Sequence, residues 1–413
     1  MQSIIVEKPY RFVPPHRGNW APSLIQRLRL VDFYLRRWEG IESFEIRGAD
    51  FLRQSLAAGH GILLTANHCR YADPIAMGWL AREVNTHVYA MASWHLFNES
   101  WWKATAIRLC GGFSVYREGA DRKSLDTAIE TLVEARRPLV LFPEGAVMRS
   151  NDVLQPLLDG VSFMARTAAK KRAKLNGCET GQVVVHPVAI KYLFRGDVDE
   201  VVRPTVEQLE RRLLVDVMHD DAPLLDRIRR LSDAQLATRE IRTFGAVQSG
   251  DEQSRRERLV EQLLSQSESR WELPRQSEQF LPRIKLIRMH LVKHLLEPGV
   301  ASVQRAAIWR TLHDIYIAQQ IASHPADYLD HPTDTRVLET VERIEEDITD
   351  SNTVLRPLHA VLQVAPAMVV PTGKVPRGEP DPLVDAIAQQ LREMLGKLAA
   401  EAAPYRATGS ATV

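Results

Sequence analysis

Short apolar runs alternate with helix-patterned segments between residues 44 and 194. The run 61–65 is continuously apolar up to Thr65 and predicts a buried strand, whereas Leu125, Ile129 and Leu132 recur at helical spacing. The same criteria predict strands at 44–47, 61–66, 86–91, 113–116, 138–142 and 183–190, the last one broken by a proline. Helices are predicted between them at 50–58, 74–82, 103–110, 124–135 and 157–171. This alternation favours an α/β fold with a mostly parallel central sheet flanked by helices.

The pattern changes after Asp197. Residues 204–350 are charged and helix-patterned without a convincing strand, which predicts a large helical C-terminal insertion or extension. Residues 360–370 are apolar enough for a returning strand, and 383–398 form an amphipathic helical pattern. The expected organisation is an N-terminal amphipathic segment, an α/β core, a helical region, and a possible closing strand and helix followed by a tail, at 1–43, 44–203, 204–357 and 358–413.

Three segments combine apolar residues with basic residues or tryptophans. Residues 24–38 predict one basic amphipathic helix, for which a bilayer interface and the protein's own core are equally good locations. Trp94, Trp101 and Trp102 favour packing in the core or along an acyl channel over a position at the lipid–water boundary, which stays open. Residues 281–296 favour a scaffold helix with a solvated basic face over a surface-binding helix.

Composition narrows the class of protein. The 413 residues are 45% hydrophobic and 25% charged, with a formal net charge of +1, which gives no global attraction to nucleic acid. The three cysteines are scattered, offer neither a disulfide framework nor a metal-ligand spacing, and favour a reducing cytoplasm. No signal-peptide profile opens the sequence, and no apolar stretch reaches the roughly 18 to 20 residues that span a bilayer.

The first candidate for chemistry is His68, five residues before Asp73 at a predicted strand-to-helix junction. At such a junction a carboxylate can fix the imidazole tautomer and stabilise the charge that the ring gains as a base. Cys69 is a poor nucleophile candidate because neighbouring residues at a strand end point apart. Glu144 also follows an apolar strand directly, and sites in open parallel sheets lie beyond the carboxyl ends of their strands.

Four ordered motifs carry a family resemblance. They are Asn67-His68 with Asp73, Gly111 with Arg117, Phe142-Pro143-Glu144-Gly145, and Val185 with Pro187-Val188. In this order they resemble the motif blocks of the glycerolipid acyltransferase superfamily, whose best-known members acylate glycerol-3-phosphate and lysophosphatidic acid.

The resemblance implies a role for each motif residue. His68 is expected to be the general base, and Asp73 to orient it and balance its charge. Arg117 is expected to bind a phosphate, and Glu144, Gly145 and Gly111 to shape the substrate site. A surface ion pair for Arg117 and a carboxylate at a helix start for Glu144 stay open as structural alternatives.

Two departures from the family pattern concern the acceptor. Arg70 stands where relatives usually have Ser, and Ala146 follows Gly145 where they have Thr, which displaces the next arginine to Arg149. Arg70 and Arg149 are weaker candidates for anion contacts. The chemistry is therefore better defined by the sequence than the identity of the acceptor.

The implied reaction moves a fatty acyl group from acyl-CoA or acyl carrier protein to a hydroxyl of a glycerol-phosphate-type or lysophospholipid acceptor. It requires no metal and no cofactor beyond the thioester co-substrate. The expected location is cytoplasmic, bound peripherally to the inner face of a membrane, with no nucleic acid partner. A non-phosphorylated lipid acceptor, a thioester hydrolase and a catalytically weak lipid-binding protein remain alternatives.

Overall fold

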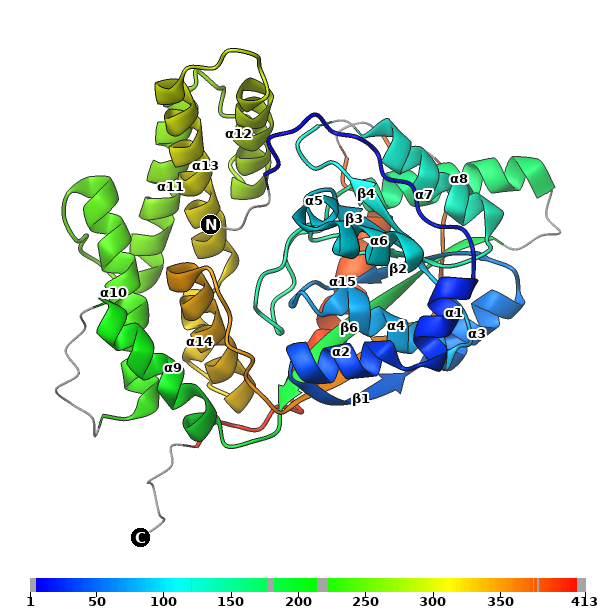
Figure 1. The fold of residues 1–413 in the computed structure, drawn as a ribbon, viewed down its shortest axis with the longest axis horizontal. Coiled ribbons are helices and arrows are strands. Elements are labelled where there is room, and N and C mark those ends of the chain that lie inside the picture. The colour runs from blue at the N-terminus through cyan, green and yellow to red at the C-terminus, as the bar shows by residue number, and fades with distance from the viewer. Residues whose placement is uncertain are drawn as a thin grey trace, which may run out of the picture. The chain divides into compact units, whose positions relative to one another are not determined.

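The computed structural model describes residues 5–119, 121–176, 182–213, 222–373, 375–376 and 379–406, so Cys178 lies outside the described residues. The chain divides into two compact units (Figure 1). The first, called here the α/β unit, comprises residues 10–195 and 354–402. The second, the helical unit, comprises residues 1–9, 196–353 and 403–413. A segment distant in sequence, 354–402, therefore returns to complete the α/β unit.

The α/β unit is built on one sheet of eight described strands in the order β1-β7-β6-β2-β5-β3-β4, with β8 also pairing to β6. The strands are β1 (Ile41–Arg47), β2 (Gly61–Ala66), β3 (Tyr89–Ser93), β4 (Gly112–Val115), β5 (Leu139–Leu141), β6 (Val183–Phe194), β7 (Leu358–Val364) and β8 (Met368–Val369). Strands β6, β2, β5, β3 and β4 run parallel, whereas β7 runs antiparallel to β6 and parallel to β1. The mostly parallel sheet expected from the sequence is therefore confirmed.

Helices connect and cover these strands. They are α1 (Trp20–Arg27), α2 (Leu30–Trp38), α3 (Ala49–Ala57), α4 (Asp73–Glu83), α5 (Leu96–Glu99), α6 (Trp101–Leu109), α7 (Arg122–Glu134), α8 (Gly160–Asn176) and α15 (Pro382–Ala399). Side chains of α7, α8 and α15 form one apolar cluster with strand residues such as Leu63, Val185 and Val361, which are fully buried. Alternate side chains of the strands thus form one side of the core, and the three helices pack against them from the other side.

Several element boundaries differ from the sequence expectation for local backbone reasons. Asn85 ends α4 at a positive φ of 53°, and the Thr86 N–H bonds back to the Ala81 carbonyl, so β3 begins at Tyr89 instead of residue 86. The Leu158 N–H bonds to the Pro143 carbonyl, which keeps 157–159 in a loop before α8.

The proline expected to break the strand at 183–190 does not break it. Pro187 lies inside the continuous strand β6, opposite Thr65 of β2. On its other side, β7 pairs from Val188 onwards and β8 pairs at Val184 and Val185, so Pro187 falls between the two partners. Its missing N–H therefore costs no ladder hydrogen bond on that side.

The predicted N-terminal helix is two helices. Arg29 adopts a left-handed conformation, with φ 52°, and separates α1 from α2. Asp32 of α2 accepts hydrogen bonds from Trp79 and Arg82 of α4, which ties α2 to the unit. Leu35 is fully buried, but most of the apolar side chains of these helices and of the turn between them are exposed, namely Trp20, Leu24, Leu28, Leu30, Phe33, Tyr34 and Trp38.

The tryptophans at 94–102 divide between the interior and the surface. Trp94 is buried, whereas Trp101 and Trp102 are 67% and 75% exposed. A core position for all three was therefore wrong. Ser100 caps α6 by accepting the Lys103 N–H, and this helix start presents Trp101 and Trp102 to solvent.

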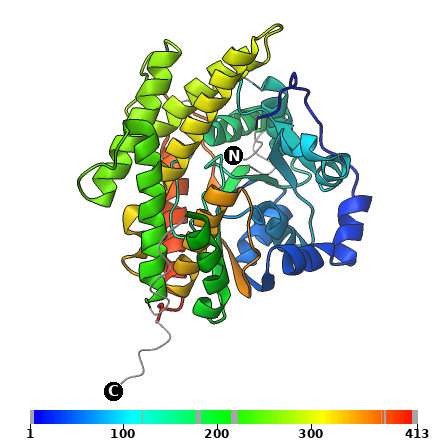
Figure 2. The ribbon, with the colours of Figure 1, turned by 60° about the vertical axis from the view of Figure 1, so that its left-hand side comes forward.

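The helical unit consists of α9 (Val198–Leu213), α10 (Leu224–Phe244), α11 (Glu252–Arg270), α12 (Phe280–Leu295), α13 (Ser302–Ser323), a 3₁₀ turn η1 (Ala326–Leu329) and α14 (Asp334–Thr349). Helix α13 packs against α11 and α12, and α14 packs against α9 and α10 (Figure 2). Helix α12 contributes Ile284, Ile287 and Leu291 to the core, as expected of a scaffold helix. Arg283 is not on a solvated face, however, since it is 1% exposed and paired with Glu268.

In the parts of the chain that the structure describes, helices long and apolar enough to cross a bilayer are absent.

Candidate active site

The structure places His68 in the loop that follows β2, at the carboxyl end of the parallel strands. Its Nδ1 lies 2.9 Å from Oδ2 of Asp73, the first residue of α4. The ring stacks on Phe142, with centroids 4.3 Å apart, and only 11% of the side chain is exposed. The expected His68–Asp73 pair therefore forms.

Asp73 is fully buried, and its carboxylate is held by several donors. The Arg70 backbone N–H lies 2.9 Å from Oδ2, and the Tyr192 hydroxyl lies 2.7 Å from Oδ1. Because a carboxylate only accepts hydrogen bonds, Nδ1 of His68 carries the proton of the neutral ring. Nε2 is then the basic nitrogen, and it has no hydrogen-bond partner among the described residues.

Glu144 lies beneath His68 in the loop after β5. Its Oε1 accepts the His68 backbone N–H at 2.6 Å, and its Oε2 accepts the Gln155 N–H at 2.8 Å. Burial raises the pKa of Glu144 to about 7, although both N–H groups favour the ionised form. The carboxylate starts no helix, since α8 begins only at Gly160, and it joins two loops at the base of the site.

Two of the candidate arginines lie close to the pair. Arg70 is 5% exposed, and its guanidinium lies 5.5 Å from the ring centroid of Tyr192. Arg149 is 8% exposed and lies 4.9 Å from the ring centroid of Tyr71, with a positive φ of 51°. Both arginines belong to loops near His68, and each cation is held over an aromatic ring, Tyr192 of β6 for Arg70 and Tyr71 for Arg149.

Arg117 follows β4, at the same sheet edge as His68 but three strands away. It is half-buried. Burial, and then the positive charge of Arg117, lower the pKa of His95 to about 4. His95 is therefore neutral at physiological pH, and Arg117 provides positive charge at this end of the sheet edge.

The two candidate glycines lie at different ends of the sheet. Gly145, with φ 74°, makes the tight turn after Phe142, where its N–H bonds to the Phe142 carbonyl at 3.1 Å. Gly111 has φ 93° and precedes β4, so the structure does not bring it to His68. A Cβ on Gly111 would lie 2.4 Å from the Val88 carbonyl oxygen, so close backbone packing accounts for the glycine.

Sequence reasoning missed two polar residues that support the pair, Tyr192 and Asn151, and named Asn67 only as part of the motif without giving it a role. Tyr192 of β6 donates to Asp73, and burial raises the pKa of its hydroxyl well above the ordinary value, so it stays a donor. Asn67 bridges to Ile190, and Asn151 bridges to Tyr192 (each accepts a backbone N–H and donates to a carbonyl). Tyr192 among the apolar residues of β6 was the available signal, because buried polar groups need partners.

Cys69 is buried behind the pair, with its Sγ 3.8 Å from Asp73 Oδ1 and 3.3 Å from Asn151 Oδ1. Among the residues that the structure describes, groups of three or more His, Cys, Asp or Glu able to hold a metal ion do not occur. The arrangement at the sheet edge is that of a positioned base, with cations beside it.

Comparisons with known proteins cover the same part of the chain. A family model described as Acyltransferase matches residues 43–191. A curated 1-acyl-sn-glycerol-3-phosphate acyltransferase from Streptococcus pneumoniae (strain ATCC BAA-255 / R6) is 33% identical over 94 residues. The alignment covers 22% of this chain and 33% of the relative, so the chain spans about a third of the length of the curated relative that it matches. The α/β unit therefore contains a domain that matches the acyltransferase family, in agreement with the glycerolipid acyltransferase resemblance that the sequence motifs indicate.

Proposed function

We propose that this protein transfers a fatty acyl group from a thioester, acyl-CoA or acyl carrier protein, to a hydroxyl of a glycerol-phosphate-type or lysophospholipid acceptor. The observation that carries the proposal is the His68–Asp73 pair at the carboxyl edge of the sheet, with Nδ1 held at 2.9 Å and Nε2 without a partner among the described residues. The acyltransferase domain and the named relative support the reaction class.

In this mechanism His68 Nε2 takes the proton from the acceptor hydroxyl as its oxygen forms a bond to the thioester carbonyl carbon. Asp73 stays ionised and stabilises the imidazolium. The tetrahedral intermediate then re-forms its carbonyl by breaking the carbon–sulfur bond. The leaving thiolate takes the proton back from His68, which yields the ester and the free thiol and returns the base to its starting state.

The rigid surroundings of the pair make this base efficient. Glu144 fixes the backbone of His68, and Tyr192 and the Arg70 N–H fix Asp73, so little reorganisation accompanies proton transfer. A positioned base of this kind typically accelerates a reaction by about 10²–10⁴-fold. We assign Arg117 to the phosphate of the substrate, with Arg70 and Arg149 as additional cations near the acceptor.

Access to lipid is assigned to α1 and α2. Their exposed Trp20, Leu24 and Phe33 provide apolar side chains for the bilayer interface. Arginines at 27, 29, 36 and 37 add attraction to anionic head groups, about 1 kcal/mol each near the surface. We therefore propose peripheral binding to the inner face of a membrane from the cytoplasm.

Vesicle co-sedimentation tests the membrane assignment. We expect salt-sensitive binding to anionic vesicles that is lost when Arg27, Arg29, Arg36 and Arg37 are changed to Gln. Equal sedimentation of the wild type and this variant at low salt contradicts the assignment.

The reaction is tested with purified full-length protein and radiolabelled acyl-CoA or acyl carrier protein. Glycerol-3-phosphate, lysophospholipids and non-phosphorylated acylglycerols serve as acceptors, together with a sample that has none. Labelled ester that requires His68 supports acyl transfer, and the preferred acceptor defines the head group. Release of free fatty acid without an acceptor points instead to a thioester hydrolase, and no turnover in any sample to a lipid-binding protein.

A further inference from the structure

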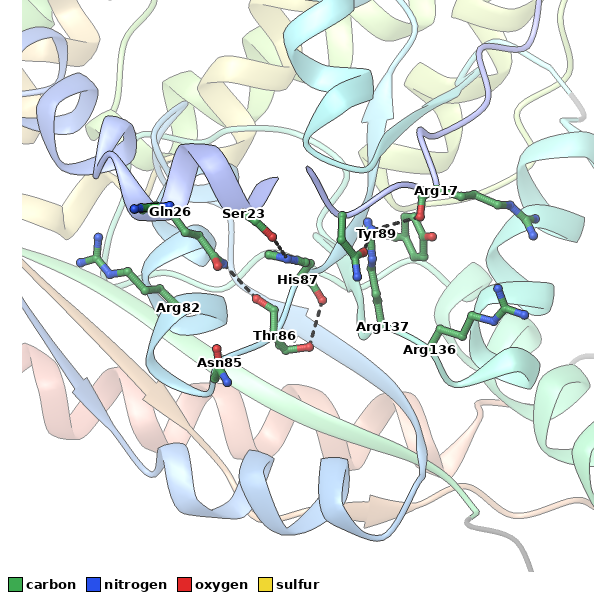
Figure 3. Close-up of a pocket in the computed structure, with 12 residues that line it drawn as sticks. Arg17, Ser23, Gln26, Arg82, Asn85, Thr86, His87, Tyr89, Arg136 and Arg137 are labelled. Atoms are coloured by element: carbon green, nitrogen blue, oxygen red, sulfur yellow. Dashed lines mark hydrogen bonds between the residues drawn. The ribbon is translucent and has the colours of Figure 1, made fainter. Parts of the chain in front are cut away.

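A cavity of about 790 Å³ lies in the α/β unit away from His68. Its walls come from α1 and the segments that lead into β3 and β5 (Figure 3). These segments enter the amino ends of the parallel strands, whereas His68 follows a carboxyl end. By strand register Arg137 is level with Gly61, seven residues before His68, which corresponds to roughly 20 Å of extended chain.

The lining of this cavity is strongly basic. The arginines among its lining residues are Arg17, Arg27, Arg82, Arg136 and Arg137, and no carboxylate residue lines the cavity in the described chain. Carboxylates behind the wall partly compensate three of them. Asp32 pairs with Arg82 at 2.7 Å, and Glu134 lies 3.2 Å from Arg17 and 3.8 Å from Arg136.

Two arginines lack such compensation. Within the described residues neither Arg27 nor Arg137 forms an ion pair. Arg27 is exposed on α1, but Arg137 is only 6% exposed. Burial lowers the pKa of Arg137, as expected for a cation removed from water without a counter-charge.

The hydrogen bonds of Arg137 leave one side of its guanidinium unused. Nη2 donates to the carbonyls of Arg17 at 3.1 Å and Gly18 at 2.9 Å, and to the Asn19 side chain. The Tyr89 ring lies 4.7 Å from the guanidinium carbon. Nη1 is buried and has no hydrogen-bond partner among the described residues. The cation is thus held in place by its backbone contacts while a donor remains for a ligand in the cavity that it lines.

We propose that this cavity is a second anion site, distinct from the site of acyl transfer, that binds a phosphate-bearing ligand through Arg137 with Arg17, Arg27 and Arg136 around it. Guanidinium forks match phosphate oxygens in geometry and charge. The ligand is a soluble phosphate compound or the phosphate of an anionic lipid head group. The exposed Trp20 and Leu24 on the helix that carries Arg27 favour the head group.

The test compares two double variants of the full-length protein. Arg17→Gln/Arg136→Gln removes two exposed cations from the cavity and leaves the arginines of 27–37 unchanged. Arg122→Gln/Arg392→Gln removes the same charge from exposed positions that do not line the cavity. A third variant, Arg137→Lys, keeps the buried charge but loses the fork, and its folding is checked by thermal unfolding.

Two binding measurements distinguish the sources of phosphate. Pyrophosphate is titrated calorimetrically, and phosphatidylcholine vesicles with and without phosphatidic acid are co-sedimented at fixed ionic strength. We expect affinity about tenfold weaker or more for the cavity variant, and within about twofold of wild type for the control variant. Saturable pyrophosphate binding identifies a soluble ligand, and a difference confined to phosphatidic acid vesicles identifies a head group.

Equal binding of the cavity and control variants in both measurements overturns the proposal, as does the absence of phosphate-dependent binding in both. Neither measurement uses acyl transfer, so the anion site stands or falls independently of the proposed function.

Discussion

Buried charged side chains are arranged differently at the His68 site of the α/β unit and between the helices of the helical unit. In the α/β unit the buried Asp73 and Glu144 bond to His68, at its ring and its backbone, and the ring keeps Nε2 without a partner among the described residues. In the helical unit buried charges pair with one another across helices, as in Arg227 with Glu210 and Arg283 with Glu268. The first arrangement positions a group for use, and the second closes a scaffold.

The difference indicates where to look for function. A buried ion pair is weak support for stability, because desolvation offsets much of its attraction. A buried carboxylate beside an accessible base has a different consequence, since it sets the tautomer and charge of that base. We therefore expect substitutions in the α/β pair to change turnover, and substitutions in the helical pairs to change stability.

The largest effect is expected for His68→Ala. Loss of the base should lower kcat by about 10²–10⁴-fold, because no other described group at the sheet edge replaces Nε2. Thermal unfolding should stay near that of the wild type, since the side chain contributes mainly to the site. The control is Cys69→Ala, which removes the buried neighbouring thiol and should keep the turnover within about tenfold. Near-normal turnover of His68→Ala would sink the mechanism.

The helical unit supplies the opposite expectation. Arg227→Met leaves Glu210 buried without its bidentate partner, whose nitrogens lie 2.9 and 2.5 Å from the carboxylate. Such an uncompensated charge should lower the free energy of unfolding by about 3–5 kcal/mol. Urea unfolding measures this, and kcat per folded molecule should be unchanged.

A double variant sharpens this test. Arg227→Met/Glu210→Leu removes both charges and should recover most of the lost stability, because neither member of this pair is left as an uncompensated buried ion. If the double variant is as unstable as the single variant, packing rather than charge explains the loss. If kcat falls with the single variant, this pair has a role beyond the scaffold.

One glutamate in each unit predicts a pH dependence of opposite sign. Burial raises the pKa of Glu144 from 4.5 to about 7. Protonation of Glu144 in the folded state therefore stabilises the protein. This contribution to the free energy of unfolding is fully present below about pH 4.5 and is lost as pH rises through 7. Burial on its own would raise the pKa of Glu240. The hydrogen bonds from Arg255 and the Gln248 N–H have the larger combined effect, so the pKa of Glu240 is lowered. That contribution is present above the unfolded pKa and is lost as pH falls.

Urea unfolding between pH 3.5 and 8 therefore distinguishes the two glutamates. In the wild type, the stability contributed by Glu144 should decrease between about pH 4.5 and 7, and Glu144→Gln should abolish this decrease. Glu240→Gln should remove a loss of stability on the acid side. Curves that run parallel to wild type for Glu144→Gln contradict the raised pKa.

The α/β order, the strands and the His68–Asp73 pair could be predicted because their signals are local. Buried parallel strands read as continuous apolar runs such as 62–64 and 183–185, and the pair spans five residues at one junction. The break at Arg29 could not be predicted, since helical spacing continues through it and only the backbone turns.

The supporting residues of the site depend on contacts between distant segments. Tyr192 reaches Asp73 from 119 positions away, and Gln155 reaches Glu144 across a loop without secondary structure. A strand pattern shows that Tyr192 is buried but not what its hydroxyl bonds to. Gly111 was assigned to the substrate from its motif, although backbone packing at the far end of β4 accounts for it.

The smallest effect is expected for Arg117→Lys. This variant tests whether the α/β unit positions Arg117, as well as His68, to contact the substrate. Arg117 lies at the sheet edge that carries His68, and its charge already acts on His95. Lysine keeps the charge but loses the planar fork that contacts two phosphate oxygens. We expect KM for a phosphorylated acceptor to rise about tenfold, which corresponds to ~1.4 kcal/mol, with a smaller change in kcat.

The matched control is Arg122→Lys on the adjacent helix, which should leave both constants unchanged. Equal losses on phosphorylated and uncharged acceptors would instead give Arg117 a structural role. In that case the α/β unit positions His68, but not Arg117, for contact with the substrate.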